Sequence, residues 1–194
     1  MRPFHLRAVV NLGGGLQREA LVPLLDAGLG SVWLRGHQAE GDALQEAEDW
    51  SDFLRAWPVA RIRSAAVWRS GCDDAVHLRV GEQRPPGSTV ASVAVHAVDE
   101  LDAVNAFEGA LPLVSPVFAP LSKKTHSEPL GLAGLRAMVA RSERPCIALG
   151  GLSSATLNAC EAAGAAGGAV LGALLEEEAR AALVAWMRSR HPAA

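Results

Sequence analysis

The chain has 194 residues, of which 49% are hydrophobic and 20% are charged, and its formal net charge is −3. This size and composition are typical of one soluble globular domain, which we expect to span residues 1–194. The sequence pI of about 6.1 excludes the strongly basic surface that binding to nucleic acid or to an anionic membrane would require.

Further features of the chain predict a cytoplasmic protein. The cysteines, Cys72, Cys146 and Cys160, are odd in number and lack zinc-like spacing, so we expect reduced thiols. The N-terminal MRPFHLRAVV lacks the apolar core and the cleavage site of a signal peptide. The longest apolar stretch, AAGAAGGAVLGALL, is too short and too rich in glycine to span a bilayer. The sequence leaves the oligomeric state open, a homodimer included.

Short apolar runs alternate with amphipathic helical patterns along the whole chain. In chain order, the expected strands are residues 5–11, 31–36, 59–64, 75–80, 89–96, 111–118, 145–151 and 166–174. The expected helices are residues 16–28, 39–56, 99–107, 131–142, 153–164 and 176–189. Only a short helix is expected after the third strand, and the Pro/Gly loop GEQRPPGS follows the fourth.

This strict alternation predicts a parallel sheet whose faces are covered by helices. Eight β/α units favour a single compact (β/α)₈ TIM barrel with shortened third and fourth units. An open, doubly wound sheet is the structural alternative.

Glycines end the last two expected strands, where such barrels often bind phosphate. Gly150 and Gly151 precede one expected helix and Gly172 precedes another, so their backbone N–H groups can approach an anion closely. We expect a phosphate site at the amides of these glycines and of Ala173, with Ser153 nearby. A simple turn is the alternative explanation for a glycine at either position alone.

The segment APLSKKTHSEP after the sixth strand contains every lysine of the chain. Lys123 and Lys124 stand side by side there, between Pro120 and Pro129. A lysine ammonium is a compact point charge that suits phosphate, so we expect Lys123 to bind a ligand phosphate and Lys124 to remain solvated. A solvated surface pair is the alternative.

Several segments together resemble the thiamine phosphate synthase and thiazole tautomerase family. They are LVSPVFAPLSKKTHSEPLGLAGLRAMV, PCIALGGLSSATLNACEAAGAAGGAVLGALL, CDDAVHLRV and VAVHAVDELDAV. Synthases of this family join a pyrimidine methyl diphosphate to a thiazole phosphate by an ionising displacement, with Mg²⁺ on the leaving diphosphate. The resemblance therefore implies an enzyme of thiamine biosynthesis that binds thiazole phosphate or thiamine phosphate.

The resemblance also implies roles for individual residues. Arg35 and Lys123 match an active-site arginine and a loop lysine of the family, and His37 stands in place of a family lysine, which implies catalytic roles for all three. The residues that match the family's phosphate-binding positions are Ser122, Gly150, Gly151, Ser153, Gly172 and Ala173.

The chain departs from the family at the metal site. The family's Asn-Asp-Arg triplet falls at Ile62, Arg63 and Ser64, where no acid is present, although Arg63 can still supply positive charge. Glu82 is the acid that remains near the expected diphosphate, and we interpret it as a weak metal ligand. Because Mg²⁺ generally takes one or two carboxylates, we expect weak or absent Mg²⁺ binding.

Two other family positions have changed as well. The serine of the family's Gly-Val-Ser-Val-His strand is Ala94, and Pro116 replaces the histidine of the tautomerases. We interpret His77 and His96 as structural histidines of apolar strands, and His126 as a titratable residue near the mouth of the barrel.

Three functional interpretations remain. The first is an enzyme of thiamine biosynthesis, a synthase or an isomerase of thiazole phosphate. The second is a catalytically degenerate relative that binds a phosphorylated heterocycle as a carrier, regulator or partner protein. The third is an unrelated phosphate-binding barrel enzyme, such as one of the tryptophan pathway. It would need a catalytic carboxylate or lysine at the end of an early strand, and we find none. The family resemblance favours an enzyme but leaves open whether catalysis survives.

Overall fold

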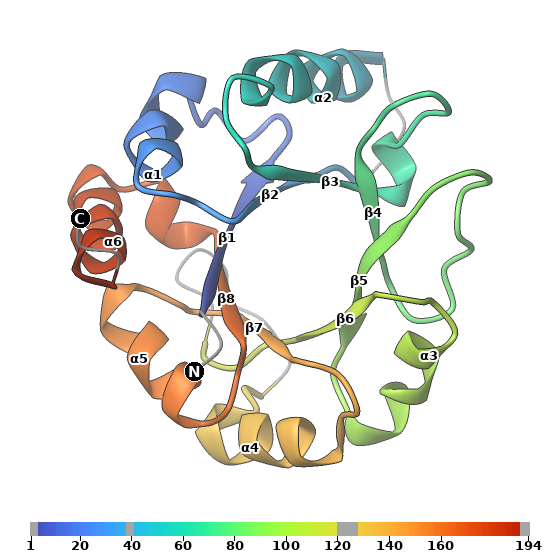
Figure 1. The fold of residues 1–194 in the computed structure, drawn as a ribbon, viewed down its shortest axis with the longest axis vertical. Helices are drawn as coiled ribbons and strands as arrows, with labels where there is room; N and C mark the ends of the chain where they lie inside the picture. The colour runs from blue at the N-terminus through green and yellow to red at the C-terminus, as the bar shows by residue number, and fades with distance from the viewer. Residues whose placement is uncertain (1–3, 38–40, 120–127, 191–194) are drawn as a thin grey trace.

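Eight parallel strands close into a barrel in the computed structural model, which describes residues 4–37, 41–119 and 128–190. The strands are β1 (His5–Asn11), β2 (Ser31–Arg35), β3 (Ala60–Ser64), β4 (Ala75–Leu78), β5 (Val90–Val95), β6 (Leu111–Val114), β7 (Ile147–Leu149) and β8 (Gly167–Val170). Each strand pairs with the next one, and β8 pairs with β1 (Figure 1). The predicted TIM barrel is confirmed, and the open sheet is wrong.

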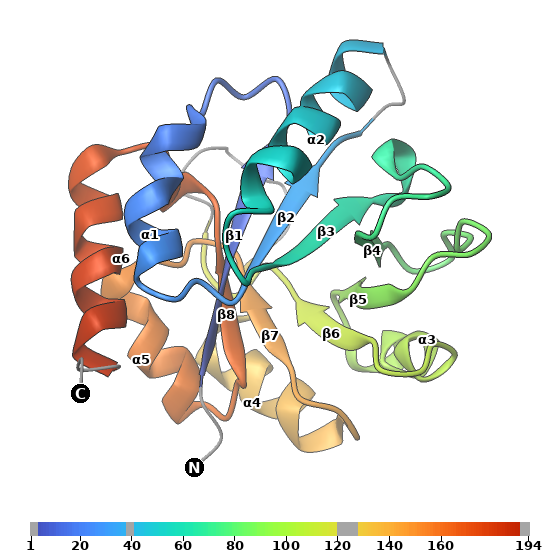
Figure 2. The ribbon, with the colours of Figure 1, turned by 45° about the horizontal axis from the view of Figure 1, so that its top comes forward.

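Helices surround the barrel unevenly. The α-helices are α1 (Val22–Asp26), α2 (Gly41–Leu54), α3 (Asp102–Asn105), α4 (Gly131–Arg141), α5 (Ser154–Ala162) and α6 (Glu177–Arg190). As expected, only the 3₁₀ turn η2 (Ala65–Val67) follows β3, and a loop without a helix joins β4 to β5 (Figures 1 and 2). Within the described residues, no helix is both long and apolar enough to cross a membrane.

Alternation along the strands separates two apolar layers. In β1, Leu6, Ala8 and Val10 belong to the large core between strands and helices, whereas Val9 belongs to a small cluster inside the barrel. This is the period-two pattern of a strand with one face toward each layer. The interior cluster contains Val9, Trp33, Ile62, Leu113, Ile147 and Ala169.

Barrel closure depends on a close approach between β8 and β1. At Gly167, a Cβ atom would lie 2.5 Å from the backbone oxygen of His5 and 2.8 Å from Cδ1 of Ile147. Both distances are far below ordinary carbon contacts, so a side chain here would push the two strands apart. Glycine at this position therefore lets the first and last strands pair.

Strand β6 ends earlier than expected, at Val114 rather than at residue 118. The peptide bond between Ser115 and Pro116 is cis, and Pro116 has no N–H to donate to the neighbouring strand. The chain then continues beside β7, where the N–H of Val117 donates to Leu149 at 2.8 Å. The prediction extended the strand because the apolar pattern runs through this interruption.

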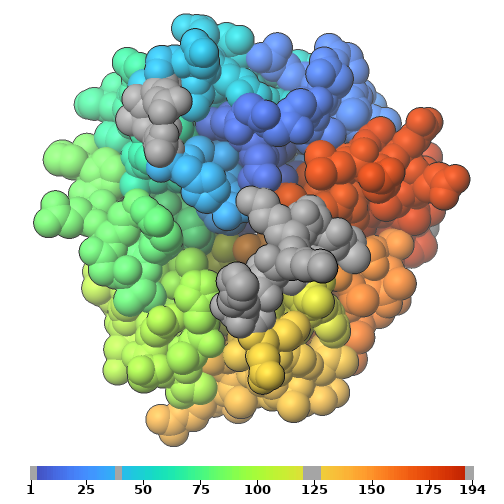
Figure 3. Space-filling view, turned by 180° about the vertical axis from the view of Figure 1, so that it is seen from behind, coloured from blue at the N-terminus to red at the C-terminus, as the bar shows by residue number. Residues whose placement is uncertain are grey.

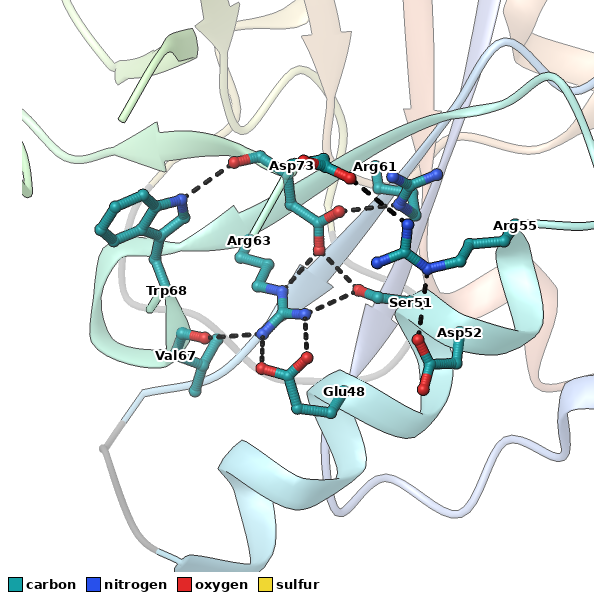
Figure 4. A network of polar contacts seen from close by, with 10 residues as sticks. Glu48, Ser51, Asp52, Arg55, Arg61, Arg63, Val67, Trp68 and Asp73 are labelled. Atoms are coloured by element: carbon teal, nitrogen blue, oxygen red, sulfur yellow. Dashed lines mark hydrogen bonds and ion pairs between the residues drawn. The ribbon is translucent and has the colours of Figure 1, made fainter. Parts of the chain in front are cut away.

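A buried network of charges joins β3 to α2 and to the segment before β4 (Figure 4). Nε of Arg63 donates to Asp74 at 2.6 Å, while its two Nη atoms donate to Glu48 at 2.8 and 3.0 Å. Asp74 also accepts hydrogen bonds from Arg61 at 2.7 Å and from Ser51 at 2.5 Å. Arg63 therefore points into the helix layer, and the expectation that it supplies charge to the ligand site is wrong.

The network also lowers the pKa values of its two carboxylates. Burial alone would raise the pKa of Asp74, but hydrogen bonds from Ser51, Arg63 and Arg61 outweigh it and lower that pKa. The hydrogen bonds from Arg63 likewise lower the pKa of Glu48. Asp74 is 4% exposed, so its charge is compensated almost entirely by these protein partners.

We predict that Asp74→Asn destabilises the protein by about 3–5 kcal/mol at pH 7, because it leaves two guanidinium groups without their buried carboxylate. Since the folded-state pKa of Asp74 lies below its unfolded value of about 3.9, its contribution is complete above that pH and is lost as the pH falls further. Urea unfolding of the variant should accordingly show a weaker dependence on pH below about 4.

Asp73→Asn is the matched control for this measurement. Asp73 pairs with Arg55 at 3.3 Å, but its side chain is 73% exposed. We expect a change within about 0.5 kcal/mol. Equal destabilisation by the two substitutions would contradict the dominance of the buried network.

Candidate functional site

A cavity of about 300 Å³ opens at the ends of β2, β4 and β5, on the carboxyl-terminal side of the barrel. Figure 3 views this side, with the first part of the chain in blue, the middle part in green and the last part in orange to red. The cavity is lined by Trp33, Arg35, Gly36, His37, Ser64, Ala66, His77, Arg79, Glu82, Ala94, His96, Leu113, Ser115 and Leu149. Its position matches the face where TIM barrels place their active sites.

Arg35 places a cation at the end of β2. Its Nη1 lies 3.4 Å from Oδ1 of Asn11, and its guanidinium lies 5.9 Å from the ring centre of Trp33. Burial lowers the pKa of Arg35, and no carboxylate among the described residues forms an ion pair with it. A half-buried guanidinium in this setting is suited to binding an anionic ligand.

The cavity floor contains a histidine whose protonation is determined by its neighbours. Nη1 of Arg7 donates to Oγ of Ser92 at 2.8 Å, and that oxygen lies 2.9 Å from Nδ1 of His77. No other acceptor for the Ser92 hydroxyl is present among the described residues, so this hydroxyl donates to Nδ1 and the proton of the ring is on Nε2. Trp33 packs against the same ring at a centroid distance of 4.0 Å.

The pKa of His77 is lowered to about 3. Burial is the main cause, and the positive charges of Arg7, Arg35 and Arg79 add to it. His77 is therefore neutral at physiological pH. The interpretation of His77 as a hydrogen-bonded structural residue agrees with this geometry, but the ring also lines the cavity.

His96 lies at the rim, exposed, just after β5. Its Nδ1 lies 2.7 Å from the backbone oxygen of Ser115, which only accepts, so Nδ1 carries a proton. The backbone N–H of His96 donates to Glu100 at 2.5 Å and orients this turn. In its neutral form His96 thus presents an unprotonated Nε2, the tautomer opposite to that of His77.

The acidic group of the cavity is Glu82, and it is already engaged. Its Oε2 accepts from the backbone N–H of Arg79 at 2.9 Å, and its Oε1 lies 3.4 Å from Nη2 of the same residue. Within the described part of the chain, no three His, Cys, Asp or Glu side chains are grouped so that they could hold a metal ion. One carboxylate that is hydrogen-bonded to Arg79 and shares the cavity lining with Arg35 does not fit the oxygen-rich coordination that Mg²⁺ prefers.

The expected site residues fall into three groups. Arg35, His37 and Glu82 meet at the cavity, and His37 is exposed at its rim. Ser122 and Lys123 lie outside the described residues. The expected phosphate-binding residues of the last two units do not line this cavity, although Leu149, immediately before the first of them, does.

The two glycines after β7 adopt backbone conformations that favour glycine, with φ of 106° at Gly150 and 60° at Gly151. A Cβ at Gly151 would lie 2.3 Å from the oxygen of Ala119, so these glycines also permit the chain after β6 to pack closely. Among the described residues, neither amide N–H has an acceptor. The expected use of both amides for phosphate therefore stays a prediction.

The other expected phosphate-binding groups differ in detail from the prediction. Ser153 is the N-cap of α5, and its N–H already donates to Oγ1 of Thr156 at 2.9 Å. After β8, Gly172 and Ala173 begin a three-residue 3₁₀ turn, and α6 starts only at Glu177. The helix expected at residues 176–189 is therefore present, but the 3₁₀ turn separates its N-terminus from Gly172.

Trp33, Arg79 and Ser64 line the cavity but were not predicted. The sequence does contain a signal for Trp33 and Arg79. Arg79 follows His77 by two residues, as Arg35 follows Trp33, and residues at this spacing on a strand face the same side. Since Arg35 lies at the mouth of the barrel, Trp33 is expected to face it as well, and the same holds for Arg79 and His77.

Comparison with known proteins gives consistent relationships. The family model described as thiamine monophosphate synthase matches residues 56–174. A thiamine-phosphate synthase of Chloroflexus aurantiacus is 32% identical over 149 residues, which cover 72% of this chain and 68% of that protein. One of Lactiplantibacillus plantarum is 34% identical over 103 residues, so the match spans 53% of this chain but only 48% of that protein.

Structural comparison agrees on the fold. A thiamine phosphate pyrophosphorylase from Pyrococcus furiosus superposes with a TM-score of 0.76 at 17% identity, covering 97% of this chain and 98% of that one.

We predict opposite neutral tautomers for the two cavity histidines. In ¹⁵N NMR spectra of the imidazoles, His77 should show a protonated Nε2 and no titration above about pH 4, and neutral His96 should show a protonated Nδ1. Because the pKa of His77 is below its unfolded value of about 6.5, its neutral state costs stability progressively as the pH falls from about 6.5 toward 3. Titration of His77 near pH 6.5 would contradict this account.

Proposed function

Because the chain belongs to the thiamine monophosphate synthase family, we propose that its cavity binds thiazole phosphate or thiamine phosphate at the carboxyl-terminal mouth of the barrel. The observation that supports this proposal most directly is Arg35. Its half-buried guanidinium faces the cavity and has no ion-pair partner among the described residues. An anionic ligand would compensate this charge.

We further propose the transferase reaction of the family as the first candidate activity. In it, the carbon–oxygen bond between the pyrimidine methyl carbon and the diphosphate breaks, and the diphosphate leaves with the bonding electrons. The thiazole nitrogen then forms the new carbon–nitrogen bond. Arg35, His37 and Lys123 would supply positive charge beside the leaving oxygens, where negative charge develops. The aromatic floor of Trp33 and His77 suits the planar rings of such substrates.

A binding protein without turnover is the second candidate. The described part of the cavity lining contains one carboxylate, Glu82, which is already engaged, and this favours the second candidate, because the family reaction uses a metal ion on the diphosphate and these residues do not fit one. Incubation of the purified protein with both substrates distinguishes the candidates. Formation of thiamine phosphate identifies the transferase, and ligand binding without product identifies the binding protein.

The remaining proposals concern the surroundings of the protein. A cytoplasmic location agrees with the three free thiols of Cys72, Cys146 and Cys160. The oligomeric state is a separate question, and light scattering at several protein concentrations distinguishes a homodimer from a monomer.

We predict that thiamine phosphate at about a hundred times its Kd stabilises the protein by about 2.7 kcal/mol, which raises Tm by roughly 5–10 °C. Arg35→Gln should weaken this binding about ten- to a hundredfold, because a charge-assisted hydrogen bond is lost. Arg136→Gln, an exposed arginine of α4, is the matched control and should change nothing. An unchanged shift in the Arg35 variant would argue against the site.

The paired lysines lie outside the described residues and remain a separate prediction. Lys123→Ala should lower the affinity for thiazole phosphate about ten- to a hundredfold, whereas Lys124→Ala should leave it unchanged. Titration calorimetry of the two variants side by side tests this. If neither matters, or if only Lys124 does, the pair is surface charge.

A further inference from the structure

The charges around the cavity are predominantly positive. Among the described residues, two guanidinium groups, Arg35 and Arg79, line it together with one carboxylate, that of Glu82. A third guanidinium, Arg7, lies inside the barrel below the floor and is 6% exposed, and its side-chain partners within the described residues are the hydroxyls of Ser31 and Ser92. This balance opposes the binding of a cation and favours an anion.

The effect of these charges is visible at His77. Its pKa is lowered first by burial and then by the positive charges of Arg7, Arg35 and Arg79 together. The floor of the cavity therefore experiences the field of all three guanidinium groups at once. A phosphoryl group entering the cavity would meet the same field with favourable sign.

The contact between Arg79 and Glu82 is weak on the side of the guanidinium. The Arg79 side chain is 75% exposed, and its Nη2 lies 3.4 Å from Oε1 of Glu82. The stronger bond of this carboxylate, at 2.9 Å, goes to the backbone N–H of Arg79. The carboxylate can thus remain in place while the guanidinium turns to another anion.

We propose that this cavity binds a diphosphate group directly between Arg35 and Arg79 without a divalent metal, and that the anion replaces Glu82 as the partner of the Arg79 guanidinium. Glu82 is then a competitor of the anion rather than a metal ligand. Two planar guanidinium groups offer paired N–H donors to phosphoryl oxygens, which gives the charge compensation that a metal would otherwise supply. The inference deepens the proposed function, since it assigns how that site takes its phosphorylated ligand.

The test is titration calorimetry with pyrophosphate alone, in EDTA and in millimolar Mg²⁺. We expect binding in EDTA that Mg²⁺ does not strengthen, and that it weakens where the ion pairs with pyrophosphate in solution. Arg35→Gln and Arg79→Gln should each weaken binding about ten- to a hundredfold. Glu82→Gln should strengthen it about two- to fivefold, because the competing carboxylate is removed. Arg136→Gln again serves as the control, and thermal melts of every variant verify that it is folded.

The opposite results overturn the proposal. They are binding that requires Mg²⁺, binding that is lost in Glu82→Gln, wild-type affinity in Arg79→Gln, or no binding of pyrophosphate to the folded wild-type protein. Because the probe contains neither the thiazole nor the pyrimidine ring, its result is independent of the turnover assay. An active transferase can therefore still require the metal to bind pyrophosphate. Conversely, a protein without turnover can still bind pyrophosphate without the metal.

Discussion

Barrel closure is the constraint on which the other features depend. The pairing of β8 with β1 requires the backbone at Gly167 to lie against His5 and Ile147, with no room for a Cβ. Only a closed ring points the ends of all strands toward one mouth and isolates a small interior from the larger core beneath the helices. The cavity, its aromatic floor and its arginines all follow from that separation of inside from outside.

The interior that closure creates is partly polar. Val9, Leu113 and Ile147 fill part of it, while Arg7, Ser92 and His77 form a hydrogen-bonded line through the rest. A buried guanidinium bonded to hydroxyls retains its full charge, since hydroxyls do not neutralise it. The barrel therefore provides part of the electrostatic environment of its mouth from within, independently of the residues that a ligand touches.

The periodicity of the sequence was sufficient to predict the fold, because each apolar strand run is followed by a helix or a recognisable Pro/Gly loop. The predicted end of a strand was wrong where a single backbone group determines it. Pro116, for example, ends β6 earlier than predicted. The site was harder to predict. Arg35 could be assigned to the mouth from its position at a strand end, but the direction of Arg63 depends on Asp74 and Glu48, which lie elsewhere in the sequence. Pairing of residues distant in the sequence is not visible in local patterns.

The charge network around Arg63 has a consequence for how this sequence can vary. Asp74 binds two arginines of β3 at once, and Glu48 binds one of them, so replacing Asp74, Arg61 or Arg63 upsets a charge balance that the remaining members cannot restore. Related chains should therefore keep Arg61, Arg63 and Asp74 as a set or exchange them together for apolar residues. In evolutionary terms these positions should covary, whereas the exposed pair of Arg55 and Asp73, one residue away, should drift independently.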